Sequence, residues 1–263
     1  MDAALAASLA AAKLFLPLVH LEAGLRCADA GLPEEINRRA IDAVATALWA
    51  PDAAAMEALA AEGRADAAVL TGNAMIATLE CTRPRWIRRH PPVPQQMFGL
   101  LTLHRVANVD DRARFAALLD ALAETAALLP LLWPMHPHTL AALTAHGLRV
   151  PRGVRTVPPL SYLDFIATLS QAAIVITDSG GVQEEATHLG IPCVTLRRAT
   201  ERPLTLSHGT NRLAGPASLP AVAAALLADP PVPQPIAGWD AQAGSRMADA
   251  LALLLEARVC RAA

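Results

Sequence analysis

The sequence predicts an α/β fold with a parallel sheet, and three observations support this prediction. Short runs rich in Val, Ile and Leu alternate with longer runs rich in Ala and Leu. Repeated β-α units of this kind form parallel sheets that helices cover on both faces. The candidate strands end in polar residues, many of them His, Glu, Asp or Arg. A Pro- and Arg-rich stretch, residues 84–96, divides the pattern into two parts.

The elements before residue 84 follow from periodicity and from helix start and stop signals. Residues 3–13 predict a helix, and Leu14–Leu21 predicts a buried strand. Pro33–Ala50 predicts a helix, because Pro-Glu-Glu is typical of a first helical turn. The remaining elements of this part are a helix over Ala53–Glu62 that Gly63 ends, and a strand over Ala67–Leu70.

After residue 96 the alternation is more regular. We expect strands over Phe98–Leu103, Leu131–Met135, Val154–Val157, Ala173–Thr177 and Cys193–Leu196. We expect helices over about 111–128, from Thr139, from Ser161 as N-cap, from Val182, over Leu219–Leu227 and over about 241–259.

These elements suggest a division into domains. We expect a first domain over residues 1–83, a linker over 84–96 and a second domain over 97–235. We expect the remaining segment, residues 236–263, to form a helix that packs back toward the N-terminal part.

The composition is that of a globular protein. Of the 263 residues, 54% are hydrophobic and 17% are charged, which excludes an intrinsically disordered chain. The net charge of −2 provides no basic field, so we expect no nucleic-acid partner. The mean hydropathy is +0.34, but charged residues and prolines interrupt the apolar runs 3–21 and 115–135. We therefore expect no transmembrane helix and no membrane partner.

The N-terminus and the cysteines point to a cytoplasmic protein. Asp2 stands where a signal peptide carries positive charge, and no small-residue cleavage site follows the apolar run. The cysteines lie far apart without a CxxC pair, which is typical of reduced thiols and not of a disulfide scaffold or zinc site. They are Cys27, Cys81, Cys193 and Cys260.

The segment Asp178-Ser179-Gly180-Gly181 separates a predicted strand from a predicted helix. Two glycines allow backbone N–H groups to approach an anion closely, and the helix N-terminus adds about half a positive charge. This arrangement suits a phosphate, although the chain has neither a P-loop nor a GxGxxG motif. Carboxylates in the following turn could accept hydrogen bonds from ribose hydroxyls, or could simply favour the helix dipole.

Two carboxylates in the first part are candidates for acid/base chemistry. Glu22 ends a predicted strand and Glu34 begins a predicted helix, so the two could converge and, with a histidine, divide proton removal and proton donation. Alternatively, Glu34 is an ordinary helix N-terminal charge, and Glu22 forms a salt bridge with Arg26 or Arg38. His136-Pro-His138 could suggest a metal, but no carboxylate cluster accompanies it, so we expect no metal site.

Several sequence strings together resemble the non-hydrolysing UDP-N-acetylglucosamine 2-epimerase family. They occur in the family's order from about residue 3 to 216. The strings are HLEAGLR at 20–26, LPEEINRR at 32–39, TGN at 71–73, LHR.AN at 103–108, MHPH at 135–138, TDSGGVQEEATHLGIPCVTLR at 177–197, ATERP at 199–203 and HGTN at 208–211.

The resemblance implies a fold and a reaction. The fold is of glycosyltransferase-B type, with two Rossmann-like domains facing a cleft that holds the UDP-sugar. The reaction interconverts UDP-N-acetylglucosamine and UDP-N-acetylmannosamine, by elimination of UDP to a 2-acetamidoglucal and re-addition with inversion at C2. It also implies a cytoplasmic isomerase of cell envelope polysaccharide biosynthesis, with a UDP-sugar as substrate, no metal or redox cofactor, and a homodimer as the usual assembly.

By match of motif, the resemblance also assigns residues. Glu22 and Glu34 correspond to acid/base carboxylates, and His104 to a catalytic histidine near the diphosphate. The matched substrate-binding positions are Arg38 and His136 in the cleft, Phe165 near the uracil, Ser179, Gly180 and Gly181 at the diphosphate, Glu185 at the ribose, and Arg202 facing sugar or phosphate.

The sequence departs from the family at its N-terminal side. It has neither the GTRPE-like strand-loop nor the later GDT motif with a further catalytic Asp. We therefore expect an incomplete first domain, with roughly a hundred residues fewer than in family members. Three alternatives remain: an epimerase, an inactive remnant that at most binds UDP or a UDP-sugar, and a hydrolysing relative that releases UDP and N-acetylmannosamine.

Overall fold

The chain folds into two units, each built around a parallel β-sheet. The computed structural model describes residues 2–29, 32–91 and 93–262, without the side chains of 257–262. Residue 92 of the expected linker and the side chain of Cys260 therefore lie outside the described residues. Unit 1 comprises Met1–Cys81, Glu201–Leu204 and Pro235–Ala263, and unit 2 comprises Thr82–Thr200 and Thr205–Gln234.

Unit 1 has a three-stranded sheet in the order β1-β2-β3. The strands are β1 (Val19–Leu21), β2 (Ala47–Ala50) and β3 (Ala68–Leu70), and all are parallel. The helices of this unit are α1 (Asp2–Lys13), α2 (Pro33–Val44), α3 (Ala53–Ala61), the 3₁₀ turn η1 (Ala65–Ala67), the start of α4 (Ala74–Trp86), and α12 (Ala243–Ala262).

The prediction of one helix over Pro33–Ala50 is wrong in its second half. Helix α2 ends at Val44, and residues 47–50 form the central strand β2, buried at every position. The Arg64 guanidinium donates to the carbonyl oxygens of Ala43 (2.9 Å) and Ala45 (2.6 Å), which satisfies acceptors at the end of α2. Ala-Leu-Trp-Ala has no strong strand propensity, so tertiary burial decides its conformation.

The predicted strand Leu14–Leu21 is also shorter than expected. Only Val19–Leu21 is extended and paired, whereas Phe15 has a φ of 55° and is exposed. Pro17 has no backbone N–H to give to a sheet, which disfavours a strand through this position. The apolar run is therefore a connection between α1 and β1.

Unit 2 has a six-stranded parallel sheet in the order β6-β5-β4-β7-β8-β9. The order runs outward from β4 in one direction and from β7 in the other, so the topology switches direction between these two neighbours. In open α/β sheets, ligands bind beyond the carboxyl ends of the strands at such a switch point. The strands are β4 (Gly99–Thr102), β5 (Leu131–Pro134), β6 (Val154–Val157), β7 (Ile174–Thr177), β8 (Cys193–Thr195) and β9 (Asn211–Leu213).

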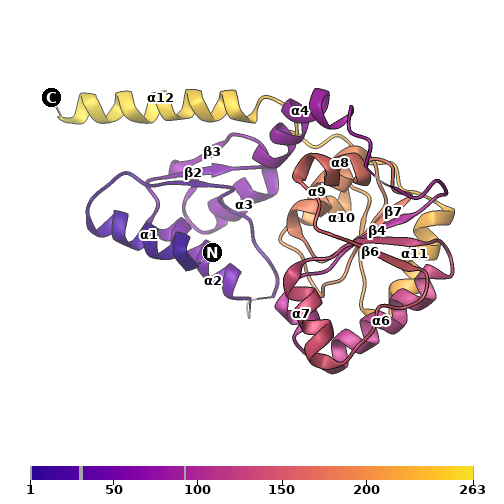
Figure 1. Ribbon diagram of the computed structural model, residues 1–263. Coiled ribbons are helices and arrows are strands. Elements are labelled where there is room, and N and C mark those ends of the chain that lie inside the picture. The colour runs from indigo at the N-terminus through magenta and orange to yellow at the C-terminus, as the bar shows by residue number, and fades with distance from the viewer. Residues whose placement is uncertain (1, 30–31, 92, 263) are drawn as a thin grey trace. The chain divides into compact units, whose positions relative to one another are not determined.

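Helices cover both faces of this sheet (Figure 1). On one face, α6 (Arg112–Ala126) and α11 (Leu219–Ala228) pack on the strands, around the fully buried Phe115 and Trp133. On the other face lie α8 (Tyr162–Leu169) and α9 (Gly180–Leu189) (Figure 1). Helix α7 (Pro137–His146) follows β5, and the left-handed Gly147 (φ 65°) ends it.

The sequence predicted the main elements of unit 2. Every strand expected after residue 96 is present, and Ser161 is the N-cap of α8 as expected. Residues 84–86, expected in the linker, instead continue α4. The sequence analysis did not predict helix α4, strand β2 or the 3₁₀ turn η1. In unit 2 it also missed α5 (Val106–Val109), α10 (Pro203–Ser207), β9 and the 3₁₀ turn η2 (Pro216–Ser218).

None of the helices within the described residues is long and apolar enough to cross a lipid bilayer.

Candidate functional site

The switch point of unit 2 places Asp178 beside His104. Both residues follow central strands, β7 and β4, which are neighbours in the sheet. The fully buried Asp178 carboxylate accepts from the backbone N of His104 (3.2 Å), the backbone N of Arg105 (3.0 Å) and Asn108 Nδ2 (3.1 Å). His104 Nδ1 lies 3.1 Å from Asp178 Oδ1.

Asp178 is therefore held as an anion. Burial alone would raise the pKa of Asp178. The hydrogen bond and the charge of His104, the backbone hydrogen bond from Arg105 and the side-chain hydrogen bond from Asn108 together hold this pKa below its usual range. The partnered carboxylate orients the His104 imidazole through the contact with its Nδ1. The His104 side chain remains 42% exposed, so its ring is accessible to a ligand.

His136 lies close to His104. It follows β5 and is the N-cap of α7, where its Nδ1 accepts from the backbone N of His138 at 3.2 Å. The centroids of the His104 and His136 rings are 6.0 Å apart. The carboxyl ends of β4, β5 and β7 thus gather two accessible imidazoles and one buried carboxylate.

The turn Ser179–Gly181 enters α9 at the same end of the sheet. Ser179 is the N-cap position, and its side chain makes no capping hydrogen bond within the described chain. The backbone N–H groups of the first helical turn have no intrahelical acceptor, so they can face an anion. The buried Gln183 holds the turn, because its Nε2 donates to the Ser179 carbonyl (3.0 Å) while its Oε1 accepts from Thr200 (2.7 Å) and Asn211 (3.1 Å).

Glu185 lies one helical turn beyond Gly181 on α9. Its carboxyl group is buried, and burial raises its pKa to about 7, although the hydrogen bond with the Tyr162 hydroxyl opposes this shift. Its Oε1 has no hydrogen-bond partner among the residues that the structure describes. Phe165, on α8 with Tyr162, is half-buried. Glu185 therefore has an acceptor for which the described residues provide no donor.

Unit 1 carries Glu22 in a strained turn. Glu22 directly follows β1 and has a φ of 58°, in the left-handed region that costs a non-glycine residue about 1 kcal/mol or more. Its Oε2 accepts from Arg202 Nη2 at 3.1 Å. The salt bridge with Arg26 or Arg38, considered as an alternative for Glu22, is not what the structure shows.

The two arginines of that alternative bind other carboxylates. Arg26 contacts Asp42 (2.7 Å) and Glu62 (2.8 Å through Nε). Arg38 donates through Nε (3.2 Å) and Nη2 (2.8 Å) to Glu35 Oε2, and it is buried. Arg38, predicted to bind substrate, is thus engaged with the neighbouring glutamate.

Glu34 and Asp52 are two further acidic residues of unit 1. Glu34 lies half-buried in the first turn of α2. Asp52 is buried as the N-cap of α3, where it accepts from the backbone N of Ala55 at 2.9 Å. Burial raises the pKa of Asp52, the Arg202 charge lowers it and the Glu22 charge raises it, so Asp52 lies near that ion pair.

The predicted site residues thus fall into two sets. Unit 1 carries Glu22, Glu34, Arg38 and Arg202, and unit 2 carries His104, His136, Phe165, Ser179, Gly180, Gly181 and Glu185. The sequence analysis assigned no role to Asp178, Gln183 or Asp42. The position of Asp178 directly after a buried strand was a signal that could have identified it.

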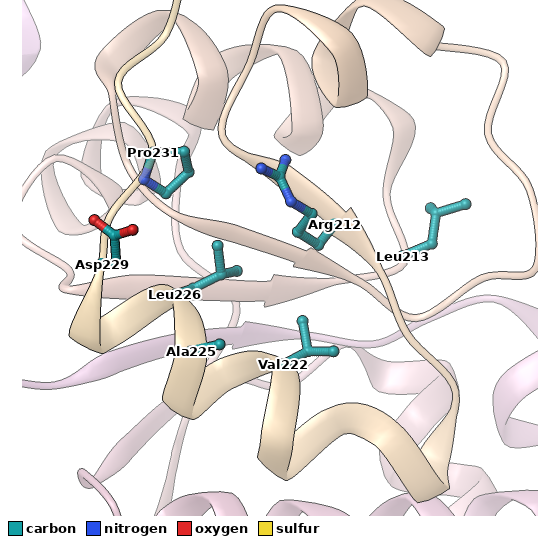
Figure 2. A pocket seen from close by; sticks show the side chains of 7 residues that line it. All are labelled: Arg212, Leu213, Val222, Ala225, Leu226, Asp229 and Pro231. Carbon is teal, nitrogen blue, oxygen red and sulfur yellow. The ribbon is translucent and has the colours of Figure 1, made fainter.

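A separate pocket of about 500 Å³ lies elsewhere in unit 2 (Figure 2). It contains two charged residues, Arg212 and Asp229, and none of the predicted site residues lines it. Its lining comes from β9, α11 and the segment that follows: Arg212, Leu213, Val222, Ala225, Leu226, Asp229 and Pro231.

Comparison with known proteins identifies the family. The family model described as UDP-N-acetylglucosamine 2-epimerase matches residues 2–252. The chain belongs to this family. The predicted fold class is confirmed with it: the protein is α/β, with Rossmann-like units of glycosyltransferase-B type.

Two relatives illustrate the similarity to this family. The chain is 37% identical over 225 residues to the UDP-2,3-diacetamido-2,3-dideoxy-D-glucuronate 2-epimerase of Pseudomonas aeruginosa, covering 82% of this chain and 62% of the relative. It is 36% identical over 225 residues to the UDP-N-acetylglucosamine 2-epimerase of Methanocaldococcus jannaschii, covering 80% and 62%. The chain thus spans 62% of the length of these curated relatives.

Solved structures agree with this assignment. The Methanocaldococcus jannaschii UDP-GlcNAc 2-epimerase in complex with UDP-GlcNAc and UDP has a TM-score of 0.89 and 30% identity, covering 96% of this chain and 74% of that one. The Neisseria meningitidis enzyme bound to UDP-GlcNAc has a TM-score of 0.76 and 27% identity, with coverages of 96% and 73%.

Proposed function

We propose that this family member interconverts UDP-N-acetylglucosamine and UDP-N-acetylmannosamine. The observation that carries the proposal is the Ser179–Gly181 turn beside the His104–Asp178 pair, at the switch point of unit 2. This is where the topology favours a nucleotide ligand, and where amide groups and an imidazole can stabilise a leaving diphosphate.

We assign UDP binding to unit 2. The amide groups of Ser179, Gly180 and Gly181 bind the diphosphate, because the helix N-terminus presents N–H groups and positive potential. The carboxyl group of Glu185 accepts hydrogen bonds from the ribose hydroxyls through Oε1, which has no partner in the described part of the chain. Phe165 contacts the uracil. His136, close to His104, binds the phosphates.

We assign the sugar chemistry to the carboxylates of unit 1 and to His104. One of Glu22 and Glu34 removes the C2 proton while the C1–O bond to UDP breaks, which gives the 2-acetamidoglucal. UDP then re-adds to C1 while the other carboxyl group delivers a proton to the opposite face of C2. Arg202 donates a hydrogen bond to Glu22, and Arg38 and Arg202 provide positive charge for the substrate.

Proton NMR in deuterium oxide tests this function. The full chain is incubated with UDP-N-acetylglucosamine, and the anomeric signals are followed over time. The expected result is UDP-N-acetylmannosamine with deuterium at C2 in both sugars. Folded protein that gives neither conversion nor exchange overturns the proposal, and UDP binding alone then identifies a non-catalytic binding protein. Accumulation of free UDP with free N-acetylmannosamine identifies a hydrolysing enzyme.

A second UDP-sugar should be tested as substrate in the same assay. The Pseudomonas aeruginosa relative, 37% identical, is named for UDP-2,3-diacetamido-2,3-dideoxy-D-glucuronate. This sugar shares the acetamido group at C2 and differs by a second acetamido group and a C6 carboxylate. The ratio of kcat/KM for the two UDP-sugars decides between the candidates, since specificity is the difference in transition-state binding.

The resemblance also leads us to propose a homodimer and a cytoplasmic location. Light scattering coupled to size-exclusion chromatography tests the first, and fractionation of the source cells tests the second.

A further inference from the structure

One buried carboxylate holds both sides of the turn that carries Glu22. Asp42 lies near the end of α2. Its Oδ1 lies 2.5 Å from His20 Nδ1, and its Oδ2 accepts from the backbone N of Gly24 at 3.1 Å. His20 and Gly24 are the residues two positions before and two positions after Glu22. Asp42 therefore closes a bridge across the Glu22 turn.

The bridge is ionic as well as hydrogen-bonded. Asp42 is 1% exposed, and Arg26 Nη2 lies 2.7 Å from its Oδ2. Burial alone would raise the pKa of Asp42, but the hydrogen bonds and charges of His20 and Arg26 hold it below the usual range. The three partners thus keep an anion in the interior of unit 1.

The turn requires such support because its backbone is strained. Glu22 has a φ of 58° without being glycine, and Gly24 has a φ of 83°. At Gly24 a side chain is also sterically excluded, since a Cβ atom would lie 2.3 Å from the Ala55 carbonyl oxygen. Strained residues of this kind persist only where the surroundings over-determine their conformation. Besides Asp42, the turn has the hydrogen bond from Ala23 N to Trp49 O (3.1 Å).

Helix α2 connects this support to Glu34. Glu34 lies in the first turn of α2 and Asp42 in its last turns, so both side chains belong to one rigid element. Eight helical residues separate them, which is about 12 Å along the axis. The helix that carries one candidate carboxylate therefore also holds the turn that carries the other.

We propose that Asp42 is a positioning residue, which fixes the Glu22 turn to α2 and thereby fixes the placement of Glu22 relative to Glu34. The inference rests on the proposed function for its catalytic consequence. Its structural part, that Asp42 locks residues 20–24, stands without that function.

Hydrogen exchange tests the structural part. In the Asp42→Asn variant, the side chain keeps its shape but loses its charge and one acceptor. We expect the Ala23 amide to exchange about tenfold faster than in the unmodified chain, while the amides of α3 change less than twofold. The matched control is Glu62→Gln, which also removes a partner of Arg26 but does not touch the turn. Unchanged exchange at Ala23, or the same acceleration at Ala23 and throughout α3, overturns the proposal.

A second variant covers failure of Asp42→Asn to fold. His20→Phe keeps an aromatic ring but has no group that can hydrogen-bond to Asp42, so it removes one arm of the bridge and leaves the contact between Arg26 and Asp42 in place. We expect about threefold faster exchange at Ala23 in this variant. No local acceleration in a folded His20→Phe protein counts against the proposal in the same way.

Kinetics tests the catalytic consequence. In Asp42→Asn we expect kcat for epimerisation to fall about 10- to 100-fold, because a small misplacement of a catalytic group has an effect of this size. The KM and the Kd for UDP should stay within about threefold, and Glu62→Gln should stay close to the unmodified chain. If the unmodified chain does not epimerise, the proposed function fails, and the exchange measurements alone decide the role of Asp42. A fall in kcat no larger than that of Glu62→Gln refutes the catalytic consequence.

Discussion

Asp178 binds His104 twice, through the backbone N at 3.2 Å and through the imidazole Nδ1 at 3.1 Å. The two residues are far apart in the sequence and follow adjacent strands of one sheet. A single buried carboxylate thus sets both the backbone and the ring of the histidine that we assign to catalysis. The orientation of His104 depends on the integrity of β7.

Asp178→Asn should weaken both stability and activity. In this variant the NH₂ group of the asparagine side chain replaces one carboxylate oxygen, so a donor would face the N–H groups that now donate to Asp178. Charge-assisted hydrogen bonds in the buried site are therefore lost. We expect a loss of about 1–3 kcal/mol in the free energy of unfolding, measured with urea, and a fall in kcat of roughly 10²-fold or more. Asp110→Asn, which removes an exposed partner of His138 (2.8 Å), is the control and should change either quantity little.

Gly181→Asp should weaken UDP binding. A carboxylate at the start of α9 would occupy the amide groups and repel a diphosphate. We expect the Kd for UDP to rise at least about tenfold in isothermal titration calorimetry. Gly244→Asp places the same side chain in open space on α12 and should bind UDP normally. Equal affinity in both variants would remove the turn from the ligand site.

Glu22→Gln should separate catalysis from nucleotide binding. The variant keeps the shape of the side chain at the end of β1 but cannot accept a proton, so kcat should fall roughly 10²- to 10⁴-fold. The Kd for UDP should be unchanged, because we assign UDP binding to unit 2. Glu57→Gln, on the exposed side of α3, is the matched control. Retention of full activity in Glu22→Gln would exclude this carboxylate from the proton transfer.

Glu185 should make stability depend on pH. Because burial raises its pKa from 4.5 to about 7, the folded chain retains a proton that the unfolded chain loses. Folding therefore becomes less favourable as the pH rises from about 4.5 to 7, by up to roughly 3 kcal/mol, and the effect levels off above pH 7. Unfolding in urea at pH 5 and pH 8 should show this loss in the unmodified chain. Glu185→Gln should lack it, and identical pH profiles of the two proteins would contradict the assignment.

Two glycines with positive φ should differ sharply in their tolerance of alanine. Gly63 (φ 71°) has open space at the Cβ position, so Gly63→Ala should cost only backbone strain, about 1 kcal/mol. Gly24 (φ 83°) would place the Cβ 2.3 Å from the Ala55 carbonyl oxygen. Gly24→Ala should therefore lower the stability of unit 1 by several times as much. Thermal unfolding of both variants checks the comparison, and equal melting temperatures would contradict it.

Elements of the fold could be predicted from the sequence where the local sequence pattern favours the conformation that the structure adopts. The apolar runs of β4, β5 and β7 are rich in Leu, Ile and Val, and they form the centre of the larger sheet. Ser161 was recognisable as an N-cap because its side chain can accept from a backbone N–H of the first turn. In these elements local preference and tertiary burial favour the same conformation.

Other features depend on partners distant in the sequence. Strand β2 is extended because it is paired on both sides, although the two alanines among its four residues do not favour a strand. Glu22 binds Arg202, which lies 180 residues away, whereas the sequence suggested nearby arginines. Asp42 had no motif to distinguish it, since its role follows from the approach of His20, Gly24 and Arg26 in three dimensions.

The left-handed Gly147 lies at the opposite end of the larger sheet from the candidate ligand site. It ends α7 and leads toward the start of β6, and nothing lies within 4 Å of a Cβ placed there. Polypeptide added at this corner would extend the amino-terminal rim of the strands and leave the carboxyl-terminal rim untouched. A fluorescent domain spliced in after this glycine would therefore tag the protein for imaging or purification without obstructing the entry of a nucleotide.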